Sequence, residues 1–277
     1  MNDLWHRFSN CSPGIYGSCL LALILFMTIF GPSFSGYASE AVHLSQKNQP
    51  PSFLFWFGTD DLGRDLFTRV WMGARLSLSV GLCAALIDLF IGLFWGGIAG
   101  FCGGKVDGAM MRFADILYAI PTLLLVILII VVLGSNLFSI ILALTLIGWI
   151  TMARIVRGQV MLIKEMDYVL AARALGAGFF RILLKHILPN ALGPILVTLT
   201  LTIPSAIFAE AFLSFLGLGI QAPQASWGTM AHEGLPSLQF YPWRLFFPAF
   251  MISLTMFAFH LIGEGLKYAF DKSGQTV

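Results

Sequence analysis

The stretch Leu123-Leu-Leu-Val-Ile-Leu-Ile-Ile-Val-Val-Leu133 contains only large apolar residues, with no alternation of apolar and polar positions. A strand of a membrane barrel would alternate, so this run favours a helix, which satisfies its own backbone hydrogen bonds in lipid. A helix needs about 20 apolar residues to cross the bilayer. We therefore predict an all-α, polytopic membrane protein with six transmembrane helices, at residues 15–34, 76–101, 115–133, 137–152, 191–216 and 245–269.

The composition of the 277-residue chain points to the same class. Apolar residues make up 58% and charged residues 11%, with a mean hydropathy of +0.85. Soluble domains are about 45–50% apolar and about 25% charged, so the composition excludes a soluble enzyme, a disordered chain and a nucleic-acid binder. The net charge of +2 is too small to predict an acidic partner. The four cysteines lie in or beside apolar runs without C-x-x-C spacing, as expected for small apolar residues rather than metal ligands.

The positive charges predict the orientation. Loops rich in Lys and Arg usually face the cytoplasm. With both termini inside, eleven of the 16 basic residues fall in inner segments. Six of these lie in the longest inner loop, residues 153–190, which is also rich in Ala and Leu and therefore helix-prone. We therefore expect both termini to be cytoplasmic. The first apolar run is longer than that of a cleaved signal peptide, so we interpret it as a retained span, although Ala38-Ser-Glu-Ala41 leaves cleavage open. The outer basic residues are Lys47, Arg64, Arg69, Arg75 and Arg244.

Ionisable residues inside the predicted spans are costly in lipid unless they are paired or hydrated. Asp115 follows Arg112 by three residues, which predicts a local ion pair. Asp88 and Glu210 have no partner nearby in the sequence. We interpret these two as candidates for a translocation pathway or gate, with a purely structural role as the alternative.

Glycines recur at every fourth position of the second predicted span, at Gly92, Gly96, Gly100 and Gly104. This spacing puts them on nearly one helix face, where a second backbone can approach closely. The alternative is that the helix is simply rich in glycine, as is the whole chain with 28 glycines.

No catalytic motif occurs in the sequence. Gly104-Lys105 resembles the end of a phosphate-binding loop, but Ala99 stands at the required first glycine and Val106 at the required Ser or Thr. No catalytic triad or metal-ligand spacing is present either. We therefore expect a non-enzymatic chain that binds neither a metal nor a cofactor.

The inner loop predicts two short helices. Residues 167–176 favour a helix that ends at Gly176 and Gly178, and residues 179–188 form a second, amphipathic run that Pro189 is expected to stop. Such a hairpin could be a knob that fits a groove on a partner. It could equally be a plain connection between two spans.

This loop resembles the loop shared by permease subunits of ATP-binding cassette importers, whose pattern is Glu-Ala-Ala, three residues, Gly, nine residues and Ile-x-Leu-Pro. Leu170 replaces the glutamate and His186 replaces the isoleucine. Because leucine has no charge, position 170 cannot form the salt bridge to the ATPase that a glutamate there could form. The matching positions of the predicted ATPase-coupling loop are Leu170, Ala171, Ala172, Gly176, His186, Leu188 and Pro189.

Further stretches narrow the resemblance. Residues 57–65, 73–77, 168–190, 210–219 and 225–228 are similar to the second, C-type permease of dipeptide, oligopeptide and nickel importers, and the similarity runs from about residue 56 to 270. The resemblance implies a type I importer permease in a bacterial inner membrane, embedded in the lipid bilayer. Its implied partners are a homologous permease, two cytoplasmic ATPases that hold ATP-Mg, and an extracytoplasmic substrate-binding protein, with no nucleic acid.

The resemblance implies import of di- or oligopeptides by alternating access, driven by the ATPases through the loop. Nickel is the alternative substrate within the family. A stand-alone secondary transporter is the alternative from a different class, and it would have no use for this loop.

The chain is expected to have two parts, residues 1–74 and a five-helix core at 75–277. In the first part an outer segment, residues 60–79, should form an interfacial helix with a pair between Asp65 and Arg69. It could brace the outer gate, contact the binding protein or anchor to the membrane surface. Its apolar stripe comprises Leu66, Phe67, Val70, Trp71 and Ala74.

Overall fold

The computed structural model describes residues 2–220 and 224–270, and within these ranges it contains helices and no named β-strand. The α-helices are α1 (Asn2–Ser9), α2 (Ser12–Ser35), α3 (Leu66–Cys102), α4 (Gly104–Tyr118), α5 (Thr122–Leu133), α6 (Leu137–Ile163), α7 (Asp167–Ala174), α8 (Phe179–Ile182), α9 (Leu188–Leu213), α10 (Trp227–Gly234) and α11 (Trp243–Phe270). Two 3-10 turns, η1 (Leu44–Gln46) and η4 (Leu235–Ser237), and two π-helical turns, η2 (Leu183–Ile187) and η3 (Ser214–Leu218), complete the chain.

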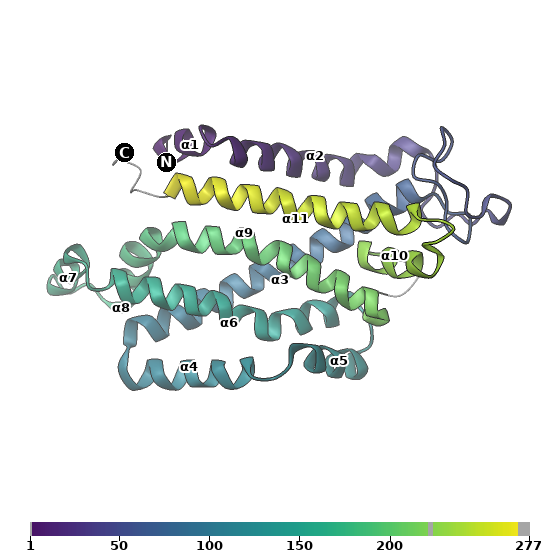
Figure 1. Ribbon diagram of the computed structural model, residues 1–277. Helices are drawn as coiled ribbons and strands as arrows, with labels where there is room; N and C mark the ends of the chain where they lie inside the picture. The colour runs from purple at the N-terminus through teal and green to yellow at the C-terminus, as the bar shows by residue number, and fades with distance from the viewer. Residues whose placement is uncertain (1, 221–223, 271–277) are drawn as a thin grey trace.

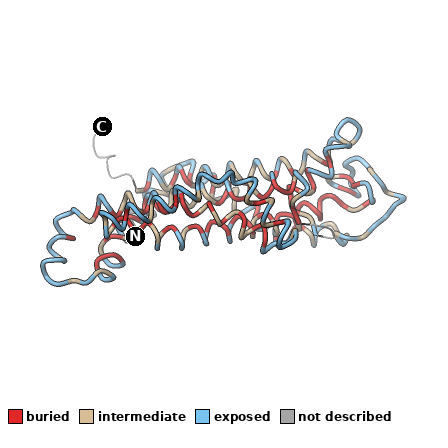
Figure 2. The backbone as a smooth tube through the Cα atoms, turned by 90° about the horizontal axis from the view of Figure 1, so that it is seen from below, coloured by how far each residue is buried: buried red, intermediate tan, exposed pale blue. Residues whose placement is uncertain are grey.

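The long helices form one elongated bundle, in which α2 lies along α11, α11 along α9, and α3 crosses behind α9 and α6 (Figure 1). The short helix α7 projects from one end, where α1 and the last turn of α11 also lie. Helix α10 and the segment 36–65 cover the opposite end. Figure 2 shows buried positions along the interior of the bundle and exposed positions on the projecting loops. We call the end of the bundle from which α7 projects the α7 end, and the opposite end, which α10 covers, the α10 end.

The bundle has the outer surface of a membrane protein. Among the described residues, five helical stretches are long and apolar enough to span a bilayer, and the bent pair α4–α5 makes a sixth if it counts as one span. Large apolar side chains point outward, such as Leu124, Leu128 and Val131 at 62%, 64% and 76% exposure. Lipid tails solvate such side chains, which water would not. The prediction of an all-α polytopic protein is confirmed.

The third predicted span, residues 115–133, differs from the prediction. Helix α4 already starts at Gly104, and α4 and α5 meet at an angle of 76°. The break lies at Pro121, whose ring has no N–H and disfavours helical geometry in the preceding residue. The segment is therefore sharply bent rather than one straight helix.

The segment predicted as an interfacial helix is continuous with the second span. Helix α3 runs without a break from Leu66 to Cys102, so the expected boundary at residue 74 falls inside it. The apolar stripe of this segment, including Val70 at 0% exposure, packs in a core with Ile24 of α2 and Ile207 of α9. The indole Nε1 of Trp227 also donates to the carbonyl oxygen of Val70 at 2.9 Å. The stripe therefore contacts protein rather than the membrane surface.

Close packing of the glycine face is confirmed for three of the four glycines. A Cβ atom at Gly92 would lie 2.7 Å from Cβ of Met152, and one at Gly100 would lie 2.8 Å from the carbonyl oxygen of Arg157. Gly96 meets the same face of α6 between them. Gly104 does not belong to this face, because α3 ends at Cys102 and Gly104 begins α4.

Candidate functional site

The projecting helix α7 ends in a turn that requires a positive φ at Gly176. Gly176 has φ of +83°, which L side chains rarely adopt. Its N–H donates to the carbonyl oxygen of Arg173 at 2.9 Å, and the N–H of Ala177 donates to that of Ala172 at 3.0 Å. These two bonds form a Schellman motif, which satisfies carbonyls at the end of the helix. The predicted helix and glycine turn are therefore present and have a defined geometry.

The α7 hairpin is attached to three long helices. Phe179 packs edge-on against Phe101 of α3 with ring centroids 4.7 Å apart, and the Arg173 guanidinium lies 5.4 Å from the centroid of the Phe101 ring. Lys164 donates to the carbonyl oxygen of Gly100 at 3.0 Å. Beneath α7, the fully buried Val169 belongs to an apolar cluster with side chains of α6 and α9. A displacement of α7 would therefore be transmitted to these helices.

Several of the exposed side chains of the hairpin are apolar, although α7 also carries the exposed Arg173. Leu170 is 42% exposed, Leu175 is 89% exposed and Phe180 is 71% exposed, and Ala171 is exposed as well. Isolated apolar residues on a surface are normal, but a cluster on a projecting hairpin suits a protein interface. The departure at Leu170 thus puts an apolar side chain where the related loops carry a carboxylate.

The second helix of the hairpin does not stop at Pro189, contrary to the prediction. The chain passes from α8 through the π-turn η2 directly into α9. In this turn the N–H of Leu188 donates to the carbonyl oxygen of Leu183, five residues earlier, and the Asn190 side chain donates to the carbonyl oxygen of His186 at 2.7 Å. The wider turn accommodates a proline that would break a regular helix. His186, Leu188 and Pro189 therefore lie at the base of the hairpin, while Leu170, Ala171, Ala172 and Gly176 lie at its tip.

Asp88 lies on the wall of a cavity of about 510 Å³ in the middle of the bundle. Its side chain is buried at 3% exposure, and Oδ1 has no hydrogen-bond partner. The walls come from α3, the bend between α4 and α5, α6 and α9, and they include Tyr118, Thr151, Thr202 and Ser205. Asp88 therefore lines a cavity, and its role in a translocation pathway stays a prediction.

Glu210 lies elsewhere and does not line this cavity. It is fully buried, and it accepts hydrogen bonds from Ser214 Oγ at 2.7 Å and Ser77 Oγ at 3.0 Å. The same Ser77 hydroxyl accepts from the N–H of Trp227 at 3.3 Å. The carboxyl group therefore joins α9, α3 and the start of α10. None of these partners is close to Glu210 in the sequence except Ser214.

A network of ion pairs holds the α10 end together. Asp60 accepts from Arg64 at 2.6 Å and from Arg69 at 2.9 Å, and Arg69 also reaches Glu233 at 3.0 Å. The predicted pair between Asp65 and Arg69 is wrong, because Asp65 caps α3 by accepting from the N–H of Thr68 at 2.9 Å. An N-cap carboxylate is a stable alternative to a surface pair. The contribution of Glu233, 164 residues away from Arg69, could not be read from the sequence.

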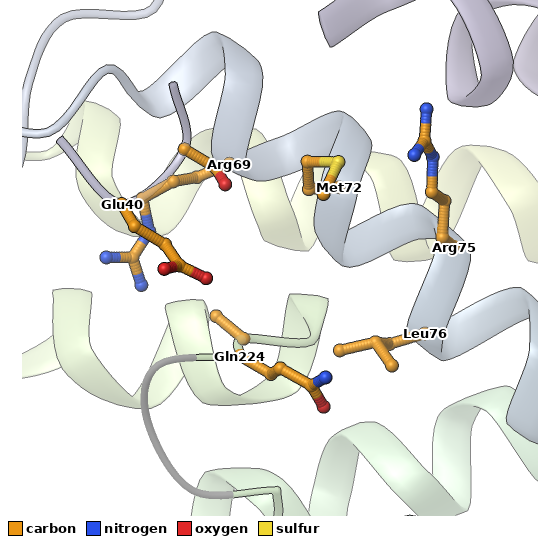
Figure 3. Close-up of a pocket in the computed structure, with 8 residues that line it drawn as sticks. Glu40, Arg69, Met72, Arg75, Leu76 and Gln224 are labelled. Carbon is orange, nitrogen blue, oxygen red and sulfur yellow. The ribbon is translucent and has the colours of Figure 1, made fainter. Parts of the chain in front are cut away.

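A second, smaller cavity of about 210 Å³ lies beside this network. Figure 3 shows Glu40 beside Arg69 on one wall, Gln224 below them, and Arg75 pointing away from the cavity. Arg69 is bound to two carboxylates, and Arg75 donates to backbone carbonyls of α2. Because both guanidinium groups are already bound, this cavity is a poorer candidate for ligand binding than that of Asp88.

In residues 2–220 and 224–270 no group of three or more His, Cys, Asp or Glu side chains is placed to hold a metal ion.

The predicted ion pair of Arg112 and Asp115 does not form. Asp115 accepts instead from Arg154 of α6 at 2.8 Å. The same guanidinium lies 4.6 Å from the centroid of the Tyr118 ring.

Two known protein families match most of the chain. Residues 92–273 match the family described as binding-protein-dependent transport system inner membrane component. Residues 1–51 match the N-terminal TM domain of oligopeptide transport permease C.

Three curated relatives are similar over almost their full length. The oligopeptide transport system permease protein OppC of Bacillus subtilis is 57% identical over 97% of this chain and 88% of its own. The dipeptide transport system permease protein DppC of the same organism is 54% identical over 97% and 84%. OppC of Escherichia coli K12 is 40% identical over 97% and 90%.

A solved structure shares the fold. An inward-facing conformation of the MetNI methionine ABC transporter matches with a TM-score of 0.60, covering 73% of this chain and 97% of that one at 18% identity. At this identity the match concerns the fold alone.

Proposed function

The chain belongs to the family of binding-protein-dependent transport system inner membrane components, and from this premise we propose that it forms the translocation path of an ATP-driven importer of dipeptides and oligopeptides. Members of this family are non-catalytic, multi-pass permeases of the inner membrane that work with ATPase and permease partners. The relatives named for oligopeptide and dipeptide transport support peptides over nickel as the substrate.

The α7 hairpin is the proposed contact with a cytoplasmic ATPase, which would hold ATP-Mg. The Schellman turn at Gly176 is the observation that carries this proposal, because it fixes an exposed apolar tip on a base packed against three spans. ATP can shift a two-state permease only through contacts that differ between the states. A rigid tip on a buried base is suited to transmit such a difference.

The orientation follows from the same assignment. Helix α1, the end of α11 and α7 lie at one end of the bundle (Figure 1). This end carries Arg7, Lys164, Arg173 and Arg181 among its basic residues. We place it in the cytoplasm by the positive-inside rule. The α10 end would then face an extracytoplasmic substrate-binding protein, and a homologous permease would complete the pathway beside the Asp88 cavity.

Co-purification with the ATPase tests the hairpin assignment. Gly176→Pro removes the positive φ and the N–H of the turn, and Ala172→Arg puts a charged side chain on the hairpin. Both should abolish co-purification while membrane insertion persists. Ala38→Arg, at an exposed position of the other end, is the matched control and should co-purify normally. Retention of the ATPase by both hairpin variants would contradict the assignment.

Reconstitution separates this function from the stand-alone alternative. The complete complex in proteoliposomes should import peptides only with ATP. Uphill transport by vesicles that contain this chain alone would establish a secondary transporter and overturn the proposal.

A further inference from the structure

The carboxylate of Asp88 is unusual because it is buried in the middle of a span and one of its oxygens has no hydrogen-bond partner. The side chain is 3% exposed, Oδ1 has no hydrogen bond, and no ion pair within the described part of the chain involves it. Taking a carboxylate out of water is costly unless an opposite charge or several donors compensate it. Such a group in a cavity is therefore a candidate for binding a ligand that brings the missing charge.

The backbone of α6 packs directly against the carboxylate of Asp88. A Cβ atom at Gly148 of α6 would lie 2.9 Å from the carboxyl carbon of Asp88 and 3.0 Å from Oδ1. Glycine at this position lets the carboxylate lie against the α6 backbone. The cavity continues from there toward α9.

The rest of the lining offers acceptors and no competing cation. The hydroxyls of Thr202 and Ser205 donate to carbonyl oxygens of their own helix at 3.0 Å and 2.8 Å. Their protons are therefore used, and their oxygen atoms can accept a hydrogen bond from a ligand. None of the described residues that line the cavity is Lys, Arg or His. The nearby Arg154 is bound to Asp115 and stacked on Tyr118. The cavity thus lacks a donor-rich cation.

We propose that Asp88 binds the ammonium group of a peptide in transit, with Thr202 and Ser205 as supporting acceptors. This inference rests on the proposed function and names the part of the substrate that the cavity recognises. The volume of about 510 Å³ lies within the range of about 300–1,000 Å³ that is usual for small-ligand sites. A single charged contact suits a transport pathway, because binding must be weak enough for release.

Protection of a thiol in the cavity tests the proposal without the binding protein. The four native cysteines, Cys11, Cys19, Cys83 and Cys102, are replaced by serine, and Thr151→Cys then adds one thiol on the cavity wall. The complex of the permeases and ATPases is treated with a maleimide in the presence of alanylalanine, N-acetylalanylalanine or N-acetylalanyllysine. A second protein that keeps only Cys102 is the control for effects outside the cavity.

Alanylalanine should protect the thiol at concentrations at least about tenfold lower than N-acetylalanylalanine, as expected for one charge-assisted hydrogen bond. Asp88→Asn should remove this difference, and labelling of Cys102 should not change. Protection by N-acetylalanyllysine would show that any ammonium group is accepted, and its absence would restrict the site to the α-amine.

Equal protection by the free and acetylated peptides, no protection by either, or an unchanged pattern in Asp88→Asn would overturn the proposal. Uptake of labelled peptide by the wild-type complex is measured separately. A complex that imports no peptide refutes the proposed function, whereas import with equal protection refutes only the role of Asp88.

Discussion

Arg75 donates from Nε to the carbonyl oxygen of Thr28 at 2.9 Å, and a terminal nitrogen of its guanidinium donates to that of Ile29, also at 2.9 Å. Both carbonyls lie within the turn of α2 that precedes Pro32. Because proline has no N–H, the carbonyl four residues earlier has no helical partner. Arg75 of α3 supplies the missing donor, and an unpaired carbonyl would be costly in lipid. Pro32 leaves a carbonyl oxygen free, and the Arg75 side chain that binds it joins α2 to α3.

Loss of the hydrogen bonds from Arg75 to α2 should destabilise the protein more when Pro32 is present than when it is replaced. We expect Arg75→Ala to lower the free energy of unfolding by about 1–3 kcal/mol, since it leaves a backbone acceptor unpaired. In a Pro32→Ala background the restored N–H can pair with Thr28, so Arg75→Ala should cost at least about 1 kcal/mol less. Thermal unfolding of the four purified proteins measures this double-mutant cycle. Equal costs in the two backgrounds would show that Arg75 acts independently of Pro32.

Glu210 offers a test between a structural brace and a gate. Glu210→Ala leaves the hydroxyls of Ser77 and Ser214 without their acceptor, at about 1–3 kcal/mol for each group. We therefore expect a lower melting temperature, with uptake per assembled complex little changed. Glu210→Gln keeps the size and one carbonyl acceptor, so it should melt between the two. A Glu210→Ala complex that melts like the wild type but imports nothing would support the gate that the sequence suggested.

The features that the sequence predicted correctly depend on local pattern. Unbroken apolar runs identify membrane helices because the bilayer imposes length and internal hydrogen bonding. The spacing of Gly92, Gly96 and Gly100 identified the packed face because helix geometry alone puts these positions together. Gly176 was identifiable for the same reason, since the end of a helix often requires a residue with positive φ.

The features that it did not predict depend on contacts between distant segments. Asp115 pairs with Arg154 rather than Arg112, and Arg69 pairs with Glu233, because the fold brings together residues that the sequence separates. The sequence shows a proline at position 121, but it does not give the angle of 76° between α4 and α5. The cavity of Asp88 could be suggested from an unpaired charge, whereas its walls could not.

The interface of α3 and α6 should not tolerate a single methyl group. In Gly96→Ala, the new Cβ would lie 3.0 Å from the carbonyl carbon of Ala153 and 3.0 Å from the N of Arg157, both backbone atoms. We expect overpacking to lower the free energy of unfolding by about 1–3 kcal/mol. Gly108→Ala is the matched control, since nothing lies within 4 Å of that position, and it should stabilise α4 by up to about 1 kcal/mol. Thermal unfolding distinguishes the two; a Gly96→Ala protein as stable as the control would contradict the close packing.

The orientation of the bundle can be measured with one native and one introduced thiol. Cys102 is exposed at the end of α3 near the α7 end, and Phe240 is 75% exposed near the α10 end. In a protein with Cys11, Cys19 and Cys83 replaced by serine, Cys102 should react with a membrane-impermeant maleimide only after the membrane is opened. After further replacement of Cys102, the Phe240→Cys protein should react in intact spheroplasts. This pattern is expected because segments rich in Lys and Arg usually stay in the cytoplasm. The reverse labelling pattern would place α7 outside the cell, where no ATPase could reach it, and the proposed coupling would fail.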